Sequence, residues 1–120
     1  MLKILIIEDE TGYQKILKDS FEKEQFEVTI ASTGKQGITD LSQNVPDIIL
    51  LDIILPGGMN GFDFLEQIKA NEKTKNIPVI VITNLASEEK VATQIGASSY
   101  FIKSDTTISQ IIEKVRQLLK

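Results

Sequence analysis

Short apolar runs recur at regular intervals along the chain. Three of them, 4–7, 48–51 and 79–82, are continuous and rich in Ile, Val and Leu. Continuous apolarity favours strands that are covered on both faces, as in a parallel sheet. The weaker runs 28–31 and 100–102 predict two further strands, and the partial alternation of the first suits an edge strand.

Amphipathic helical patterns lie between these runs. Three apolar stripes have helical spacing: Tyr13, Ile16, Leu17 and Phe21; Phe62, Leu65 and Ile68; and Ile108, Ile111, Ile112, Val115, Leu118 and Leu119. Thr33-x-x-Gln36 and Thr107-x-x-Gln110 predict capping boxes at two helix starts. Ser87 predicts an N-cap, and Gly96 predicts the end of the helix that follows it.

Strand and helix patterns therefore alternate five times, which predicts an α/β fold with a parallel sheet and helices on both faces. We expect residues 1–120 to form one (βα)5 domain with a doubly wound, five-stranded sheet. The strand order 2-1-3-4-5 is taken from known flavodoxin-like folds, because periodicity alone does not set it.

Composition narrows the chemistry. The 120 residues are 42% hydrophobic and 25% charged, as expected of a soluble globular domain. Cys and His are both absent, so a metal must be a hard cation held by oxygen, and any phosphohistidine must belong to another molecule. A net charge of −4 without a basic block disfavours direct nucleic-acid binding. The apolar N-terminal run is too short for a signal peptide or membrane span, so we expect a cytoplasmic protein.

The polar residues directly after the apolar runs are the most informative feature of the chain. The predicted strands end in Glu8-Asp9, Asp52, Thr83 and Lys103. In a parallel sheet these ends share one edge, and ligands bind there at the switch point in strand order, between the first and third strands. Taken alone, an acid after a strand is most often a solvated turn residue. Complementary groups at five such positions instead predict a site.

Three carboxylates in one crevice repel each other. A pair about 4 Å apart, at an effective dielectric of about 20, costs about 4 kcal/mol. Either one carboxyl stays protonated or a cation lies among them. An all-oxygen donor set favours Mg²⁺ as that cation.

This combination resembles the receiver-domain (CheY-like) family of two-component signalling over essentially the whole chain. The family's pattern has an acidic pair after strand 1, Asp after strand 3, Thr after strand 4 and Lys after strand 5. The segment Ile-Leu-Leu-Asp52-Ile-Ile-Leu-Pro56 is similar to its phosphorylation loop.

The resemblance implies a role for each of these positions. Asp52 is expected to be the nucleophile that takes the phosphoryl group. The implied Mg²⁺ ligands are Asp9, Asp52, the backbone carbonyl of Ile54 and, through water, Glu8. Thr83 and Lys103 would contact the acyl phosphate, and Tyr100 would be the switch aromatic. An ordinary edge-strand aromatic is an equal alternative for Tyr100.

The resemblance further implies a phosphoacceptor switch rather than a multiple-turnover enzyme. The phosphodonor would be a sensor histidine kinase or a phosphotransfer protein. Phosphorylation would remodel the face formed by the fourth helix, fifth strand and fifth helix. This face would then control a downstream protein target, an attached output domain or phosphorylation-dependent homodimerisation. Val91 and Ile95 lie near the expected output face, although plain core is an equal alternative for them.

The sequence departs from the family pattern at three places. Gly61 lies one residue later than usual after the nucleophile, so the 57–60 loop is one residue longer than in the family pattern. Asn84 follows Thr83 where a small residue is usual, and is expected to narrow access to the phosphate. Ser104 follows Lys103 where a cis proline is usual, so the turn is expected to be trans and rebuilt.

Three other classes of protein fit the sequence less well. A haloacid dehalogenase-type phosphatase needs a second Asp two residues after the nucleophile, where this chain has Ile54. A flavodoxin-like binding protein needs a hydroxyl-rich phosphate loop after the first strand, where this chain has three acids. A P-loop enzyme needs a G-x-x-x-x-G-K-[ST] motif, which is missing. A receiver-fold scaffold that is not regulated by phosphorylation stays open as the alternative.

Overall fold

The computed structural model describes residues 1–120 and contains one five-stranded sheet with all strands parallel, in the order β2-β1-β3-β4-β5. The strands are β1 (Lys3–Ile7), β2 (Glu27–Ala31), β3 (Ile48–Leu51), β4 (Val79–Thr83) and β5 (Ser99–Ile102). The helices are α1 (Thr11–Lys23), α2 (Gly34–Gln43), α3 (Gly61–Ala70), α4 (Glu89–Ile95) and α5 (Ile108–Leu118). Two short 3₁₀ turns are η1 (Ala86–Glu88) and η2 (Lys103–Asp105). The predicted fold and strand order are confirmed.

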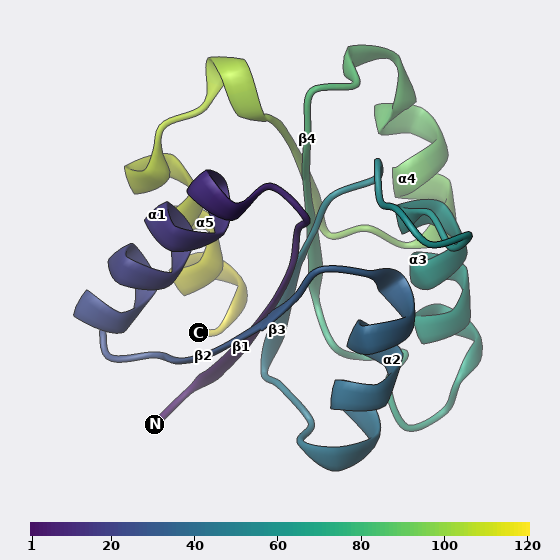
Figure 1. The fold of residues 1–120 in the computed structure, drawn as a ribbon, viewed down its shortest axis with the longest axis horizontal. Helices are drawn as coiled ribbons and strands as arrows, with labels where there is room; N and C mark the ends of the chain where they lie inside the picture. Colours follow the sequence, from purple (N-terminus) through teal and green to yellow (C-terminus); the bar gives the residue numbers. More distant parts are fainter.

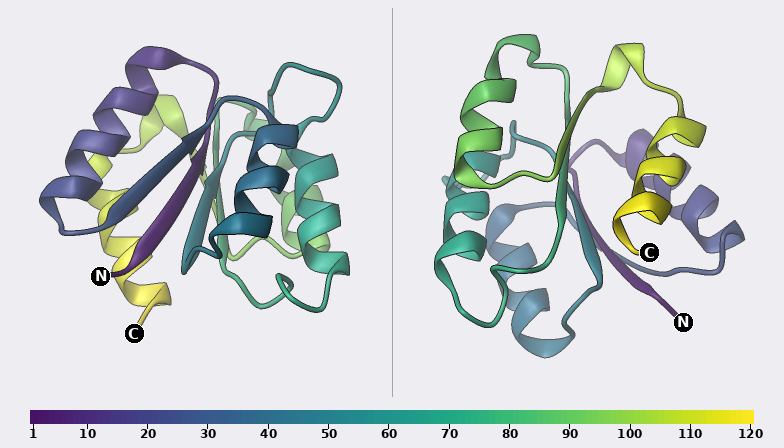
Figure 2. Two further views of the ribbon diagram at one scale, coloured as in Figure 1. Left: turned by 60° about the horizontal axis from the view of Figure 1, so that its bottom comes forward. Right: turned by 180° about the vertical axis from the view of Figure 1, so that it is seen from behind.

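The sheet separates two layers of helices. Helices α1 and α5 cover one face, and α2, α3 and α4 cover the other (Figures 1 and 2). Each face has its own core, because successive residues of a strand point to opposite sides. In β1, Ile4 and Ile6 pack toward α1 and α5, whereas Leu5 and Ile7 pack toward α2 and α3. None of the helices combines the length and apolarity needed to cross a bilayer.

Strands β1, β3 and β4 are the three central strands of the sheet. Helices cover both of their faces, which is why their sequences are continuously apolar. Every residue of β3 and β4 is buried, and the register pairs Ile7 with Leu51 and Leu51 with Val81. The ladder continues one step further, because the Asp52 amide donates to the Ile7 carbonyl at 3.0 Å. Asp52 is therefore held beside the end of β1, where the acidic pair begins.

The helix starts match the predicted signals in part. Thr107 and Gln110 form a reciprocal capping box, as predicted. Thr33 caps α2, but the Gln36 side chain accepts from the Ser32 amide instead of the Thr33 amide, so that box is not reciprocal. The predicted N-cap at Ser87 is wrong. Ser87 lies inside η1, and α4 begins at Glu89 without a side-chain cap.

One position of the predicted α1 stripe is also wrong. Leu17 and Phe21 are fully buried and Tyr13 is half-buried, but Ile16 is 50% exposed. Ile16 lies at the margin of the stripe, about 100° around the helix from Leu17, where the sheet no longer covers it.

Helix α1 ends in a Schellman motif at a residue that is not glycine. The Phe26 amide donates to the Phe21 carbonyl at 3.0 Å and the Gln25 amide to the Glu22 carbonyl at 2.9 Å, with the two phenyl rings packed edge to face. Gln25 occupies the left-handed position with φ of 67° and is the only residue other than glycine with positive φ. A side chain at this position is strained.

We predict that Gln25→Gly raises the free energy of unfolding by about 0.5–1 kcal/mol, because glycine adopts the left-handed conformation without steric cost. Urea unfolding followed by circular dichroism measures the change. Gln25→Ala is the matched control and should give no gain, since alanine keeps the strained Cβ. A glycine variant no more stable than the alanine variant would contradict this account.

Candidate functional site

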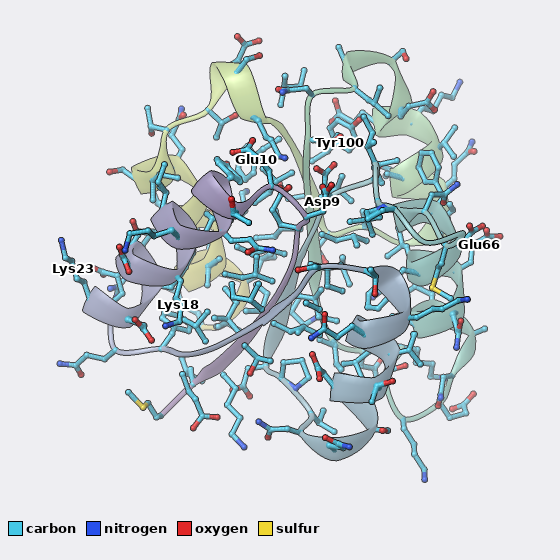
Figure 3. The ribbon with its side chains drawn as sticks, viewed as in Figure 1. Asp9, Glu10, Lys18, Lys23, Glu66 and Tyr100 are labelled. Atoms are coloured by element: carbon cyan, nitrogen blue, oxygen red, sulfur yellow. The ribbon has the colours of Figure 1, made fainter.

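The predicted site residues meet at the carboxyl edge of the sheet. Glu8, Asp9 and Asp52 each contribute a carboxylate oxygen, and these oxygens lie within 4.8 Å of one another. Glu8 and Asp52 are buried, whereas Asp9 is exposed. Figure 3 labels Asp9 and Tyr100 at this end of the molecule, above the strands. These residues therefore meet where β1 and β3 end, as expected from the strand order.

Lys103 joins two of these acids. Its Nζ lies 2.5 Å from Glu8 Oε1 and 2.8 Å from Asp52 Oδ2. The three side chains are 13%, 3% and 7% exposed, respectively, so the contacts form in a largely dehydrated environment. Charge-assisted bonds of this kind offset part of the cost of burying the two carboxylates.

Backbone amides occupy the other oxygens of the same two acids. Asp52 Oδ1 accepts from the Ile54 amide at 3.1 Å, and Glu8 Oε2 accepts from the Glu10 amide at 3.0 Å. Each carboxylate is thus oriented by one amide and one ammonium. Both oxygens of Glu8 therefore have a protein partner.

The environment shifts the protonation equilibria of two site groups. Burial raises the pKa of the Glu8 carboxyl, and the bonds from Lys103 and the Glu10 amide only partly oppose this. Burial acts to lower the pKa of Lys103, but its hydrogen bonds to Asp52 and Glu8 outweigh that effect and the pKa is raised. Lys103 is therefore a permanent positive charge in the site at neutral pH.

Thr83 lies at the end of β4 and is fully buried. Its Oγ1 has no hydrogen-bond partner. Buried hydroxyls are normally satisfied, so an unsatisfied one at a ligand-binding edge points to a missing polar partner. A phosphoryl oxygen would supply an acceptor of the required kind.

Tyr100 lies on β5 and reaches toward the loop after β4. Its hydroxyl donates to the Leu85 carbonyl, and the residue packs against a small cluster of Ile53, Val81 and Ala92. The ring therefore links β5 to the segment that follows Thr83. Of the two residues expected near the output face, Val91 is 42% exposed and Ile95 packs partly against the core.

The longer loop after Asp52 is accommodated by glycine. Gly57 and Gly58 take positive φ values of 88° and 85°. Asn60 then caps α3 in a reciprocal box with Asp63. At Gly61 a Cβ atom would lie 2.3 Å from the Asp52 carbonyl oxygen and 2.5 Å from the Ile53 Cα. The backbone of α3 therefore packs directly on the backbone that carries Asp52.

The other two positions that depart from the family pattern, Asn84 and Ser104, are joined by a hydrogen bond. The Ser104 amide donates to Asn84 Oδ1 at 3.0 Å. This bond needs an N–H that proline lacks and a side chain longer than the small residue that is usual after Thr83. All peptide bonds are trans, and the turn after Lys103 is rebuilt as η2, as expected. The Asn84 amide thus bonds across to the Lys103 turn.

Two residues of α1 outside the predicted site, Tyr13 and Gln14, also contact it. Lys103 Nζ lies over the Tyr13 ring, 4.9 Å from its centroid. The Gln14 side chain donates to the Glu8 carbonyl and to Ser32 Oγ. The only sign of this in the sequence is that both residues belong to the first turn of the helix after the acidic pair. That turn begins at the same edge of the sheet as the site.

The donor set fits a hard divalent cation. Its members are carboxylates alone, with no nitrogen or sulfur ligand nearby, which matches the preferences of Mg²⁺. The Lys103 ammonium contacts two of the three acids, and Asp9 adds a third carboxylate beside them without an ion-pair partner. The unsatisfied Thr83 hydroxyl adds a place for an anionic ligand in the same site.

Comparison with known proteins agrees with this fold. The profile of the response regulator receiver domain matches residues 4–116. This chain therefore belongs to the receiver-domain family of two-component response regulators. Receiver domains bind Mg²⁺ at an acidic cluster, and in this chain that cluster is Glu8, Asp9 and Asp52.

Individual relatives support the assignment. Response regulator ArlR of Staphylococcus saprophyticus is 35% identical over 122 residues, which cover all of this chain and 53% of that protein. A CheY-like receiver domain protein of Methanospirillum hungatei superposes with a TM-score of 0.89 at 30% identity, covering 99% of this chain and 94% of its own. The receiver domain of sensor histidine kinase PA1611 from Pseudomonas aeruginosa, 22% identical, superposes with a TM-score of 0.88, covering 98% and 97% of the two chains. The chain spans about half the length of the first curated relatives it matches.

We predict that Gly61→Ala lowers the free energy of unfolding by about 2 kcal/mol, because the new methyl group overlaps the Asp52 backbone. Thermal unfolding measures the loss. Gly12→Ala in α1 is the control and should cost much less, since the atom nearest its Cβ is Glu10 Oε1, 3.3 Å away, a side-chain cap that can shift, and not backbone. Equal effects of the two substitutions would refute close backbone packing at Gly61.

Proposed function

We propose that Asp52 is the phosphoacceptor of a two-component phosphorelay. Response regulators receive phosphoryl groups from histidine kinases, and the donor here would be a sensor histidine kinase or a phosphotransfer protein. The observation that supports this most is the position of the Asp52 carboxylate. It lies among the three-carboxylate cluster, in contact with Lys103, at the edge where Thr83 keeps an unsatisfied hydroxyl.

The transfer step is consistent with these contacts. A carboxylate oxygen of Asp52 attacks the phosphorus of the donor's phosphohistidine, so a P–O bond forms as the P–N bond breaks. The leaving nitrogen of the donor imidazole keeps the bonding electron pair and takes a proton from water, which gives neutral histidine. Lys103 balances charge on the phosphoryl oxygens, and the Thr83 hydroxyl donates a hydrogen bond to one of them. The Ile54 amide keeps the Asp52 carboxylate aligned.

The same residues would hold Mg²⁺. Asp9 and Asp52 would bind it directly, together with the backbone carbonyl of Ile54, whereas Glu8 would bind through water. When bound, Mg²⁺ neutralises charge on the transferred group. The receiver domain of PA1611, which shares the fold, has a magnesium ion coordinated in its active-site cleft. The carboxylate cluster of this chain supports the same assignment.

The phosphorylated state would be read through Tyr100. Phosphorylation adds roughly 1.5 to 2 negative charges and three acceptor oxygens beside Thr83. A shift of Thr83 toward them changes the loop whose Leu85 carbonyl accepts from Tyr100. The change would reach the face formed by α4, β5 and α5, and so control binding of a downstream target, an attached output domain or a second copy.

The chain would act as a switch and not as a multiple-turnover enzyme. It would assist its own phosphorylation and lose the phosphoryl group slowly. An unregulated scaffold is the alternative, but it would not require Lys103 to be buried between two acids.

We predict that acetyl phosphate with Mg²⁺ adds one phosphoryl group to the parent protein, as measured by intact mass. Asp52→Asn should abolish the addition because it removes the nucleophile, and EDTA should prevent it. Asp19→Asn, on the exposed side of α1 in an ion pair with Lys15, is the control and should be labelled normally. Labelling of Asp52→Asn equal to that of the parent would rule out this phosphoacceptor.

We also predict that the phosphoprotein is long-lived. Ile54 and Leu85 stand where the family tunes hydrolysis, and neither side chain can orient an attacking water. Mass spectrometry after removal of acetyl phosphate measures the decay. A half-life shorter than about a minute would contradict the prediction, and Ile54→Asn should shorten the half-life by supplying a polar group.

A further inference from the structure

We propose that Tyr13 is a positioning residue for Lys103. The face of its ring keeps the Lys103 ammonium beside Asp52. The inference rests on the proposed phosphoacceptor function of Asp52. The first turn of α1 would thereby take part in phosphoryl transfer, in addition to packing against the core.

The contact has the geometry of a cation–π interaction. Lys103 Nζ lies 4.9 Å from the centroid of the Tyr13 ring, within the range of about 6 Å in which ring and cation attract. The Lys103 side chain is 13% exposed, so little water competes for its ammonium. Ammonium groups in such dehydrated sites gain more from an aromatic face than exposed ones do.

The ring is anchored from two directions. The Tyr13 amide donates to the Glu10 side chain at 3.1 Å, which fixes the start of α1 next to the acidic pair. The side chain packs against the buried cluster between the sheet, α1 and α5. Neither contact involves a residue of the loop that follows Asp52.

The hydroxyl of Tyr13 does not explain why an aromatic residue lies here. Its oxygen is buried without a hydrogen-bond partner, which costs free energy. Burial also raises the pKa of this phenol, so the ring stays neutral beside the acids. The feature that remains is the π face, which an aliphatic residue of similar size would not offer to Lys103.

The need for this support arises during the reaction. In the present structure Glu8 and Asp52 share the ammonium. Once Asp52 becomes an acyl phosphate, its carboxylate no longer serves as a free anionic partner, and Lys103 must turn to the phosphoryl oxygens. The ring face is unchanged by the chemistry and limits the positions that the ammonium can take.

A double-mutant cycle tests the proposal. Tyr13→Leu and Tyr13→Phe are each made in the parent and in Lys103→Met, and initial rates of labelling by acetyl phosphate with Mg²⁺ are followed by intact mass. In the parent we expect Tyr13→Leu to slow labelling about fivefold and Tyr13→Phe to restore the rate to within about twofold. In the Lys103→Met background, Tyr13→Leu should cause no further slowing.

Two results would overturn the proposal. One is equal slowing by Tyr13→Leu in both backgrounds, which would show that the ring acts through packing alone. The other is a loss with Tyr13→Phe as large as that with Tyr13→Leu, which would implicate the hydroxyl.

A stability measurement separates this proposal from the proposed function. If the parent takes no phosphoryl group, the phosphoacceptor function fails. Thermal unfolding of the parent, Tyr13→Leu, Lys103→Met and the double variant then tests whether the ring and the ammonium interact. We expect Tyr13→Leu to lower the Tm by about 3 °C more in the parent than in Lys103→Met. Identical Tm shifts in the two backgrounds would show that the ring does not hold the ammonium.

Discussion

The site depends on one interaction, the placement of the Lys103 ammonium between two buried carboxylates. Burying the Glu8 and Asp52 carboxylates at 3% and 7% exposure is costly, and the ammonium between them offsets part of that cost. Lys103 lies after β5, whereas its partners follow β1 and β3, and β4 stands between them in the sheet. Its long side chain therefore reaches past the end of β4, where Thr83 lies. The contact exists only if all four strand ends are in place.

Backbone contacts as well as charge hold Asp52 in place. The Asp52 amide extends the ladder to the end of β1, and its carboxylate accepts from the Ile54 amide. On the opposite side, Gly61 brings the first turn of α3 against the Asp52 carbonyl, closer than any Cβ would allow. Asp52 is thus confined between a strand and a helix, so its carboxylate can vary little in position. Such preorganisation suits a reaction that requires mainly alignment and charge neutralisation.

The departures from the family pattern are compensated where they occur. The extra residue after Pro56 is taken up by two glycines in left-handed conformations, and Asn60 restores a capped start for α3. The Asn84 side-chain oxygen accepts from the Ser104 amide. This bond joins the segment after Thr83 to the turn that carries Lys103. The arrangement of acids and lysine therefore persists although the loops around it differ.

Local pattern was sufficient for the fold class and for most elements. The continuous apolar run of β3 predicted its bounds, and the polar residues after each strand identified the site, because parallel strands end at one edge. The strand order and the individual roles needed the family resemblance, since periodicity contains no information about which strands pair. Capping at Ser87 and burial of Ile16 were predicted wrongly, because a 3₁₀ turn and the limited extent of the sheet decide them.

The contacts of Tyr13, Gly61 and Asn84 with the site were decided by tertiary structure alone. Each joins residues that are distant in sequence or separated by a loop, and their geometry depends on how the helices are placed on the sheet. The sequence by itself determined which chemical groups reach the edge of the sheet. Only the packed structure decided which of these groups touch, because distances of a few ångströms depend on every layer beneath them.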